Sequence, residues 1–248
     1  MSKQRSGVIV TGGSKRVGAE LCRYFAKNNF DVALHYNNSK NEAIALQKEI
    51  KNMGVACEIF AQDLVDSNGL HKLMENIYAK MPNCNILINN ASIFERCEFM
   101  ETDKDLFDRH FAINFKAPFF LTQAFAKLFG KNPDAKNANY CVINILDTDI
   151  SKNQISHFAY LLSKRNLADF TKMAAVALGA DIRVNGVCPG HMLPSAQLYE
   201  GYEEKVRQMV PLKKNPSLDD LSEAVFWLAE QTSITGQIIN VDCGKHLV

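Results

Sequence analysis

The chain has 248 residues, a length that fits either one large α/β domain or two small domains. Hydrophobic residues make up 47% of it and charged residues 22%, which argues against a disordered, collagen-like or coiled-coil protein. The formal net charge is +1, so no overall positive field draws the protein to nucleic acid or to anionic lipid.

Cysteine and histidine usage argues against disulfides and metals. The seven cysteines are scattered and form no Cys-x-x-Cys pair, and the six histidines are dispersed without metal-ligand spacing. Neither a signal peptide nor a run of 18 or more apolar residues is visible. We therefore expect a soluble, cytoplasmic protein with reduced thiols and no metal, whose partner is a small molecule.

Strand-like and helix-like segments alternate along the whole chain, which is the pattern of a parallel sheet with crossover helices. No linker, repeat or low-complexity tract divides it. We therefore predict one doubly wound α/β domain of the Rossmann type, covering residues 1–248. Apolar runs rich in β-branched residues predict seven strands, at residues 7–10, 31–36, 55–61, 85–88, 140–146, 182–187 and 237–241.

Two stretches between the strands have apolar residues at helical spacing, and each predicts a helix with one face on the sheet. The one long irregular stretch, residues 189–216, contains four prolines and predicts a loop that contacts the substrate. The residues expected on the two sheet-facing helix faces are Ala43, Leu46, Ile50 and Met53, and Leu167, Phe170, Ala174 and Ala177.

A turn with glycines, TGGSKRVG at residues 11–18, follows the first strand and precedes a helix. Glycines at such a turn let the backbone approach a pyrophosphate, whose charge then lies at the helix N-terminus. The spacing is not G-x-G-x-x-G, so a turn that binds nothing is the alternative. Asp63 and Asp66, after the third strand, can each cap the helix that follows, and for Asp66 this is the better explanation.

The segment HYNNSK, residues 35–40, ends the second strand, where a dinucleotide fold meets the adenosine ribose. An NAD enzyme commonly has Asp or Glu here, and such a carboxylate would repel a 2′-phosphate. This strand ends without an acid and offers hydrogen-bond donors and one positive charge. The segment therefore favours NADPH over NADH.

Tyr160 and Lys164 share one face of a predicted helix because they are four residues apart. An ammonium near a phenol stabilises the phenolate and draws its pKa toward neutrality. Reduction of a C=O or C=N bond needs such a proton donor, since the heteroatom gains a proton as the carbon gains a hydride. The two residues predict a catalytic pair, with an ordinary surface pair as the alternative.

Two further polar residues are candidates for the same site. Asp147 ends the fifth strand, and a partly buried carboxyl there could have a raised pKa and pass protons to a tyrosine or a ring nitrogen. Asn114 lies inside a helical stretch, where asparagine is unfavourable, so it indicates a functional role, a kink or an accidental polar residue.

These motifs resemble the short-chain dehydrogenase/reductase family over nearly the whole chain. Thr11, Gly12 and Gly18 match its T-G-x-x-x-G-x-G turn, with Arg16 in place of the middle glycine. Arg16, together with Asp147 where most members have serine, resembles the pteridine reductase branch in particular.

The resemblance implies roles for these residues. Asn114, Asp147, Tyr160 and Lys164 are expected to be catalytic, with Asn114 holding a water in a relay with the lysine. Phe94 is expected to stack on a flat pterin, and core packing is its alternative. Substrate contacts are expected from Arg16, Ser92, Phe94, Asp147 and Tyr160. Cofactor contacts are expected from Thr11, Gly12, Arg16, Val17, Gly18, His35, Tyr36, Asn37, Asn38, Ser39, Asp63, Leu64, Asn90, Ala91, Ser92, Tyr160, Lys164, Pro189 and Gly190.

Nine of the fifteen phenylalanines lie between Phe94 and Phe129, several of them at helical spacing, such as Phe107, Phe111, Phe115 and Phe119. Without interleaved Lys or Arg, this stripe predicts a buried or intersubunit helix face rather than a platform for nucleic-acid bases. The resemblance implies a homo-oligomer, often a tetramer in this family.

The expected function is NADPH-dependent reduction of a C=N bond in a dihydropterin or a dihydrofolate-like substrate. Reduction of a carbonyl, such as a 3-oxoacyl thioester, is the alternative, although carbonyl reductases of the family generally have serine at the position of Asp147. A protein that binds NADP(H) without chemistry is a third possibility, although sensor-like relatives have often lost the tyrosine or the lysine. His157 and His191 lie near the site in sequence and receive no catalytic role.

Overall fold

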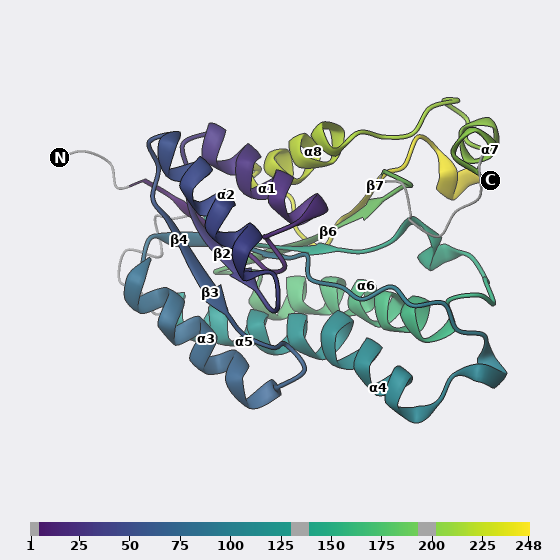
Figure 1. Ribbon diagram of the computed structural model, residues 1–248, viewed down its shortest axis with the longest axis horizontal. Coiled ribbons are helices and arrows are strands. Elements are labelled where there is room, and N and C mark those ends of the chain that lie inside the picture. The colour runs from purple at the N-terminus through teal and green to yellow at the C-terminus, as the bar shows by residue number, and fades with distance from the viewer. Residues whose placement is uncertain (1–4, 130–138, 193–201) are drawn as a thin grey trace.

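Seven parallel strands form one sheet in the order β3-β2-β1-β4-β5-β6-β7 (Figure 1). The computed structural model describes residues 5–129, 139–192 and 202–248. The order reverses between β1 and β4, and ligands of such sheets bind outside the carboxyl ends of the strands at this point. The strands are β1 (Gly7–Val10), β2 (Asp31–Tyr36), β3 (Cys57–Ala61), β4 (Cys84–Asn89), β5 (Cys141–Ile145), β6 (Arg183–Pro189) and β7 (Ile238–Val241).

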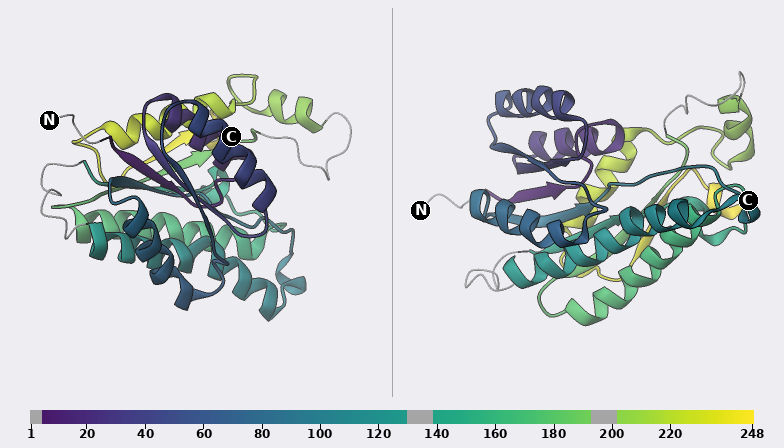
Figure 2. Two further views of the ribbon diagram at one scale, coloured as in Figure 1. Left: turned by 60° about the vertical axis from the view of Figure 1, so that its left-hand side comes forward. Right: turned by 60° about the horizontal axis from the view of Figure 1, so that its bottom comes forward.

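Helices cover both faces of the sheet, so the molecule has three layers (Figure 2). One face carries α1 (Arg16–Lys27), α2 (Lys40–Asn52) and α8 (Leu218–Glu230). On the other face lie α3 (Ser67–Lys80), α4 (Lys104–Phe111), α5 (Ala117–Phe129) and α6 (Phe158–Leu178). None of the described helices is both long and apolar enough to cross a membrane.

The strands are mostly apolar because helices cover both faces of the sheet. In β1, Val8 and Val10 pack into the core beneath α1, α2 and α8, whereas Ile9 points into the core on the side of α3, α5 and α6. The predicted doubly wound fold is confirmed. β1 and β2 have the predicted ends. The other five strands differ from prediction by one or two residues at one or both ends, since apolar runs do not mark where interstrand hydrogen bonds begin and stop.

Two residues predicted on sheet-facing helix faces are placed wrongly. Met53 caps the end of α2 and is 37% exposed, and Ala177, near the end of α6, is also exposed. Met53 follows the last residue of α2, and Ala177 points away from the core although Ala175 and Leu178 on the same helix pack in it.

The predicted substrate loop is described only in part. Residues 193–201, which include Pro194, lie outside the described residues. The part that follows contains α7 (Tyr202–Met209), which lies close to the C-terminus of the chain (Figure 1). The expected contact of this loop with substrate therefore stays a prediction.

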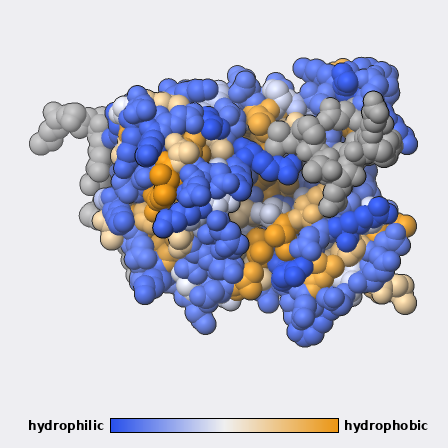
Figure 3. Space-filling model, viewed as in Figure 1, coloured by the Kyte–Doolittle hydropathy of each residue, from blue (hydrophilic) through white to orange (hydrophobic). Residues whose placement is uncertain are grey.

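A π-helical turn, Ala112–Lys116, joins α4 to α5 and contains Asn114, where the sequence indicated a kink. The phenylalanine stripe runs along these helices from Phe107 to Phe119 in successive ring contacts. It is only partly covered, and Figure 3 shows apolar side chains at the surface in the region of α4 and α5.

Candidate active site

The turn after β1 is tied to the end of β4 by two side chains. The hydroxyl oxygen of Thr11 accepts hydrogen bonds from the N–H groups of Asn90 (2.9 Å) and Ala91 (3.0 Å). The amide of Asn90 in turn donates to the carbonyl oxygen of Thr11 at 2.9 Å. These bonds join the two strands at the reversal of the sheet, so Thr11, Asn90 and Ala91 lie together as predicted.

The backbone of this turn leaves no room for a side chain at Gly18. A Cβ atom at Gly18 would collide with the carbonyl oxygen of Gly12, whose own φ is +61°. Arg16 has a φ of +52°, the left-handed conformation that favours glycine, which explains why the family pattern has glycine there. α1 starts with no side-chain cap and no acidic residue in its first turn, which suits it to receive an anion.

His35 supports the turn from beneath. The N–H of Gly12 donates to Nδ1 of His35 at 3.1 Å, and Nε2 of the same ring lies 2.9 Å from the carbonyl oxygen of Gln62. Burial lowers the pKa of His35 to about 4, so the ring is neutral. His35 and the buried Tyr36 therefore face the interior, and only the residues after them, Asn37, Asn38, Ser39 and Lys40, reach the surface.

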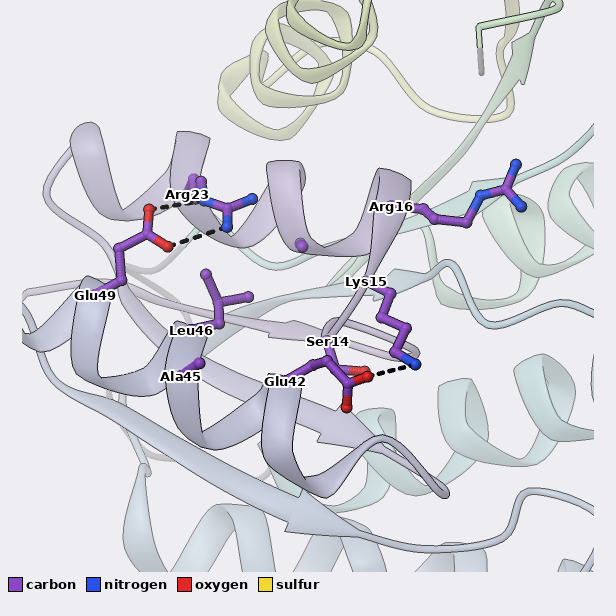
Figure 4. A pocket seen from close by; sticks show the side chains of 9 residues that line it. Ser14, Lys15, Arg16, Arg23, Glu42, Ala45, Leu46 and Glu49 are labelled. Carbon is purple, nitrogen blue, oxygen red and sulfur yellow. Dashed lines mark hydrogen bonds and ion pairs between the residues drawn. The ribbon is translucent and has the colours of Figure 1, made fainter. Parts of the chain in front are cut away.

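A polar groove of about 530 Å³ lies between α1 and α2 beside this turn (Figure 4). At one end Lys15 forms an ion pair with Glu42 (2.7 Å), and at the other Arg23 pairs with Glu49 (2.8 Å). Arg16 points away from the Lys15–Glu42 pair. The groove is lined only by residues of the turn, α1 and α2, and the sequence analysis did not single out Lys15.

Asp63 and Leu64 lie after β3, whereas Pro189 is the last residue of β6 and Gly190 follows it. One carboxylate oxygen of Asp63 accepts from the N–H of Val65 at 3.0 Å, whereas Asp66 caps α3, as predicted for it. Leu64 and Val17 pack into the two cores. Gly190 approaches the backbone of Asp242 so closely that a Cβ would collide with it.

Tyr160 and Asp147 meet at the carboxyl end of β5. The tyrosine hydroxyl donates to Oδ2 of Asp147 at 2.7 Å, and Oδ1 of Asp147 accepts from the N–H of Asp149 at 2.8 Å. Burial raises the pKa of Asp147. Burial and the neighbouring Asp147 carboxylate raise the pKa of Tyr160 well above its usual value.

The expectation that Lys164 draws the pKa of Tyr160 toward neutrality is wrong for this structure. Nζ of Lys164 lies 5.9 Å from the centre of the Tyr160 ring and donates to the carbonyl oxygen of Ile145 at 2.7 Å. The carboxylate of Asp147 is much closer to the phenol, so the phenolate is disfavoured. Burial lowers the pKa of Lys164 itself to about 8.

Asn114 is fully buried, and both the oxygen and the NH₂ group of its side chain form hydrogen bonds within the protein. Its oxygen accepts from the Ser92 hydroxyl (3.1 Å) and the N–H of Ile93 (3.0 Å). Its NH₂ group donates to the carbonyl oxygen of Ile93 and to the hydroxyl of Ser163, both at 3.1 Å. A water relay to Lys164 could therefore use only the main chain of Asn114, not its side chain.

Phe94 follows β4 and is 61% exposed, so it is not a core residue. Its ring meets the Tyr160 ring edge to face, with centroids 4.7 Å apart. Ser92, Phe94, Asp147 and Tyr160 thus lie at one end of the sheet, and their contact with substrate stays a prediction.

A second set of contacts holds the segment that carries Asp147, and the sequence analysis missed it. The hydroxyl of the buried Thr148 donates to the carboxylate of Asp242, which also accepts from the N–H groups of Gly244 (2.9 Å) and His246 (2.8 Å). Lys245 forms an ion pair with Asp149 at 2.8 Å. The C-terminal turn therefore holds the segment that follows Asp147 in place. No signal in the sequence links these segments.

Comparisons with known proteins agree with this geometry. The family model described as enoyl-(acyl carrier protein) reductase matches residues 13–246. The crystal structure of FolM alternative dihydrofolate reductase 1 from Brucella suis in complex with NADP superposes with a TM-score of 0.91 at 33% sequence identity, covering 98% of this chain and 96% of that one.

Two curated proteins differ in the substrate that their names indicate. Pteridine reductase 1 of Leishmania tarentolae is 27% identical over 276 residues, covering 96% of each chain. The 3-oxoacyl-acyl-carrier-protein reductase FabG of Staphylococcus epidermidis is 24% identical over 244 residues, covering 96% of this chain and 98% of its own.

Proposed function

The chain belongs to the short-chain dehydrogenase/reductase family of oxidoreductases, and we propose that it reduces a C=N bond of a pteridine with NADPH. The substrate class is a dihydropterin or a dihydrofolate-like molecule. The observation that carries this proposal is the hydrogen bond from Tyr160 to Asp147, because a buried carboxyl stands where carbonyl reductases of the family generally have serine.

The residues of the turn after β1 fit NADP, the cofactor bound to the Brucella FolM structures. Gly18 allows an approach that any side chain would block, and the uncapped start of α1 suits a pyrophosphate. NADPH, when bound, supplies the hydride. The predicted contacts best placed for it are Thr11, Gly12, Arg16, Gly18, Asn37, Asn38, Ser39, Asp63, Asn90, Ala91 and Ser92.

The proton comes from the Tyr160–Asp147 pair. Reduction of a C=N bond adds a hydride to carbon and a proton to nitrogen. Because the pKa of Tyr160 is raised, its hydroxyl keeps its proton at neutral pH and can donate it as negative charge develops on the substrate nitrogen. Asp147 accepts the tyrosine hydrogen bond as a carboxylate, and because burial raises its pKa it can take up a proton from solvent and pass it to the phenolate.

Lys164 acts on Tyr160 and does not contact the substrate in this proposal. Its ammonium is buried behind the Tyr160 ring and is held by a main-chain carbonyl. A positive charge there stabilises the phenolate once the proton has left. Arg16, Ser92 and Phe94 are proposed to hold the heterocycle, with the ring of Phe94 offering it a flat surface.

Reduction of a 3-oxoacyl thioester is the second candidate, favoured by the similarity to FabG. Loss of NADPH should be measured with dihydropterins, dihydrofolate and an acetoacetyl thioester side by side. The proposal expects turnover of a pteridine and fails if only the thioester reacts. In either case Tyr160→Phe should abolish turnover and leave NADPH binding intact. A protein that only senses the cofactor would show no turnover with any of these substrates.

A homo-oligomer, a tetramer by family resemblance, and a cytoplasmic location belong to the same proposal. Oligomer formation is supported by the apolar surface of α5 and α6, where Phe119, Phe120, Met173 and Val176 are exposed. Val176 is 87% exposed in the single chain, which is unfavourable for so apolar a side chain in water. Sedimentation of the purified protein tests the oligomeric state.

A further inference from the structure

The imidazole ring of His157 lies flat against the phenyl ring of Phe94. Their centroids are 4.2 Å apart and their planes differ by 11°. His157 caps the start of α6, three residues before Tyr160, whereas Phe94 lies in the segment after β4. The stack therefore joins two separate parts of the candidate site.

The backbone holds the two rings in this relation. Residues Cys97 and His157 form a parallel β-bridge, in which the N–H of Cys97 donates to the carbonyl of Ser156 (3.2 Å) and the N–H of Phe158 donates to the carbonyl of Cys97 (3.0 Å). The hydroxyl of Ser156 lies 3.1 Å from Nδ1 of His157 and fixes the orientation of the imidazole. The stack is thus anchored at both ends.

We propose that His157 is a positioning residue, which holds Phe94 in the plane that a flat substrate ring needs. The imidazole covers one face of the phenyl ring, and since Phe94 is 61% exposed, much of the ring is left to receive a second flat ring. Without the imidazole, Phe94 would keep only its edge-to-face contact with Tyr160 and would be less restricted before binding, and the cost of fixing it would reduce substrate affinity. The inference rests on the proposed function, which supplies the flat substrate.

A competing reading gives the opposite result. If the imidazole occupied the face of Phe94 that the substrate takes, binding would have to displace it. Removing the ring would then strengthen substrate binding instead of weakening it. The sign of the change separates the two readings.

The test compares His157→Leu, which has a side chain of similar size but no flat face, with His157→Phe, which retains a ring for stacking. For a dihydropterin, His157→Leu should raise KM about fivefold to tenfold and leave kcat within about twofold. His157→Phe should restore KM, and NADPH binding should be unchanged in both. An unchanged or lowered KM in His157→Leu would overturn the proposal.

The stack can also be observed without substrate, by NMR of protein labelled with ¹³C in histidine. The ring current of Phe94 shifts the carbon-bound ring protons of His157 upfield, and Phe94→Leu should move them downfield. If they do not move, the stack and the proposal fail, whatever the substrate is. If they move but the wild-type protein reduces no dihydropterin, the proposed function has failed while the stack stands, and the positioning role is refuted for pteridines.

Discussion

The hydroxyl of Tyr160 donates a 2.7 Å hydrogen bond to the carboxylate of Asp147, and burial raises the pKa of both groups. A buried phenol beside a carboxylate keeps its proton instead of losing it. We propose that this pair supplies the proton that the reduction consumes. In this proposal the ammonium of Lys164 opposes the effect of the carboxylate, because a positive charge near the phenol stabilises the phenolate.

Replacement of Asp147 by Asn or Ser should lower kcat/KM for a dihydropterin by about 100-fold or more, because positioned proton transfer contributes that much. Asp147→Asn keeps the shape of the side chain but cannot carry a proton. NADPH binding should not change, since Asp147 lies away from the phosphate turn. Full activity in Asp147→Ser would contradict the role given to the carboxyl.

The pH dependence of the same variants has a defined sign. Asp147 supplies a proton only in its protonated form, and its raised pKa keeps that form present to higher pH than an ordinary aspartate. Wild-type activity should therefore fall as the pH rises through the pKa of Asp147. The profile of Asp147→Asn should lack this fall, and an identical profile would count against this role of Asp147.

Lys164 should give a separate loss of activity at alkaline pH. Burial lowers its pKa to about 8, so it is charged below that value and neutral above it. If the ammonium stabilises the phenolate, kcat/KM should fall roughly tenfold per pH unit above pH 8. Lys164→Met, which keeps most of the length but no charge, should be weakly active and show no such fall. A wild-type profile that stays flat through pH 9 would refute this role.

Arg16 combines backbone strain with a proposed substrate contact, and two variants separate them. Arg16→Gly removes both the guanidinium and the unfavourable left-handed conformation, whereas Arg16→Ala keeps the strain. Both should raise KM for a dihydropterin about tenfold, which is the loss of affinity expected when one hydrogen bond from a charged group is removed. In urea unfolding, Arg16→Gly should be about 1 kcal/mol more stable than Arg16→Ala. Equal stability would show that the turn relaxes without cost.

The sequence predicts those parts of the protein that depend on local patterns. Strand β1 could be predicted because Val8, Ile9 and Val10 must be apolar in a sheet buried on both faces. The pKa of Tyr160 could not, because helical spacing brings a lysine near but does not encode that the phenol is buried against a carboxylate. Contacts between distant segments, such as Thr148 with Asp242, were missed for a similar reason, since they depend on how β5 and β7 end in space.

His35 should make the protein sensitive to mild acid. Its pKa is lowered from 6.5 to about 4 by burial, so the unfolded chain binds a proton between these values that the folded protein does not. Folding stability is therefore complete above pH 6.5 and falls as the pH drops toward 4, by up to about 3 kcal/mol. His35→Asn, measured by urea unfolding at pH 7 and pH 5, should lose less stability between the two. The same loss in both proteins would exclude His35 as the cause.

Thr148 should link stability to catalysis, because its hydroxyl ties the segment after Asp147 to the buried Asp242. Thr148→Val keeps the shape but leaves a carboxylate with one donor fewer, so the free energy of unfolding should fall by about 2 kcal/mol. Asp147 caps the 3₁₀ turn that begins at Thr148, so kcat for a dihydropterin should fall as well, while NADPH binding stays unchanged. Thr148→Ser retains the hydroxyl and should recover most of both losses. If Thr148→Val lost stability but kept its kcat, the C-terminal turn would support the fold without positioning the catalytic carboxyl.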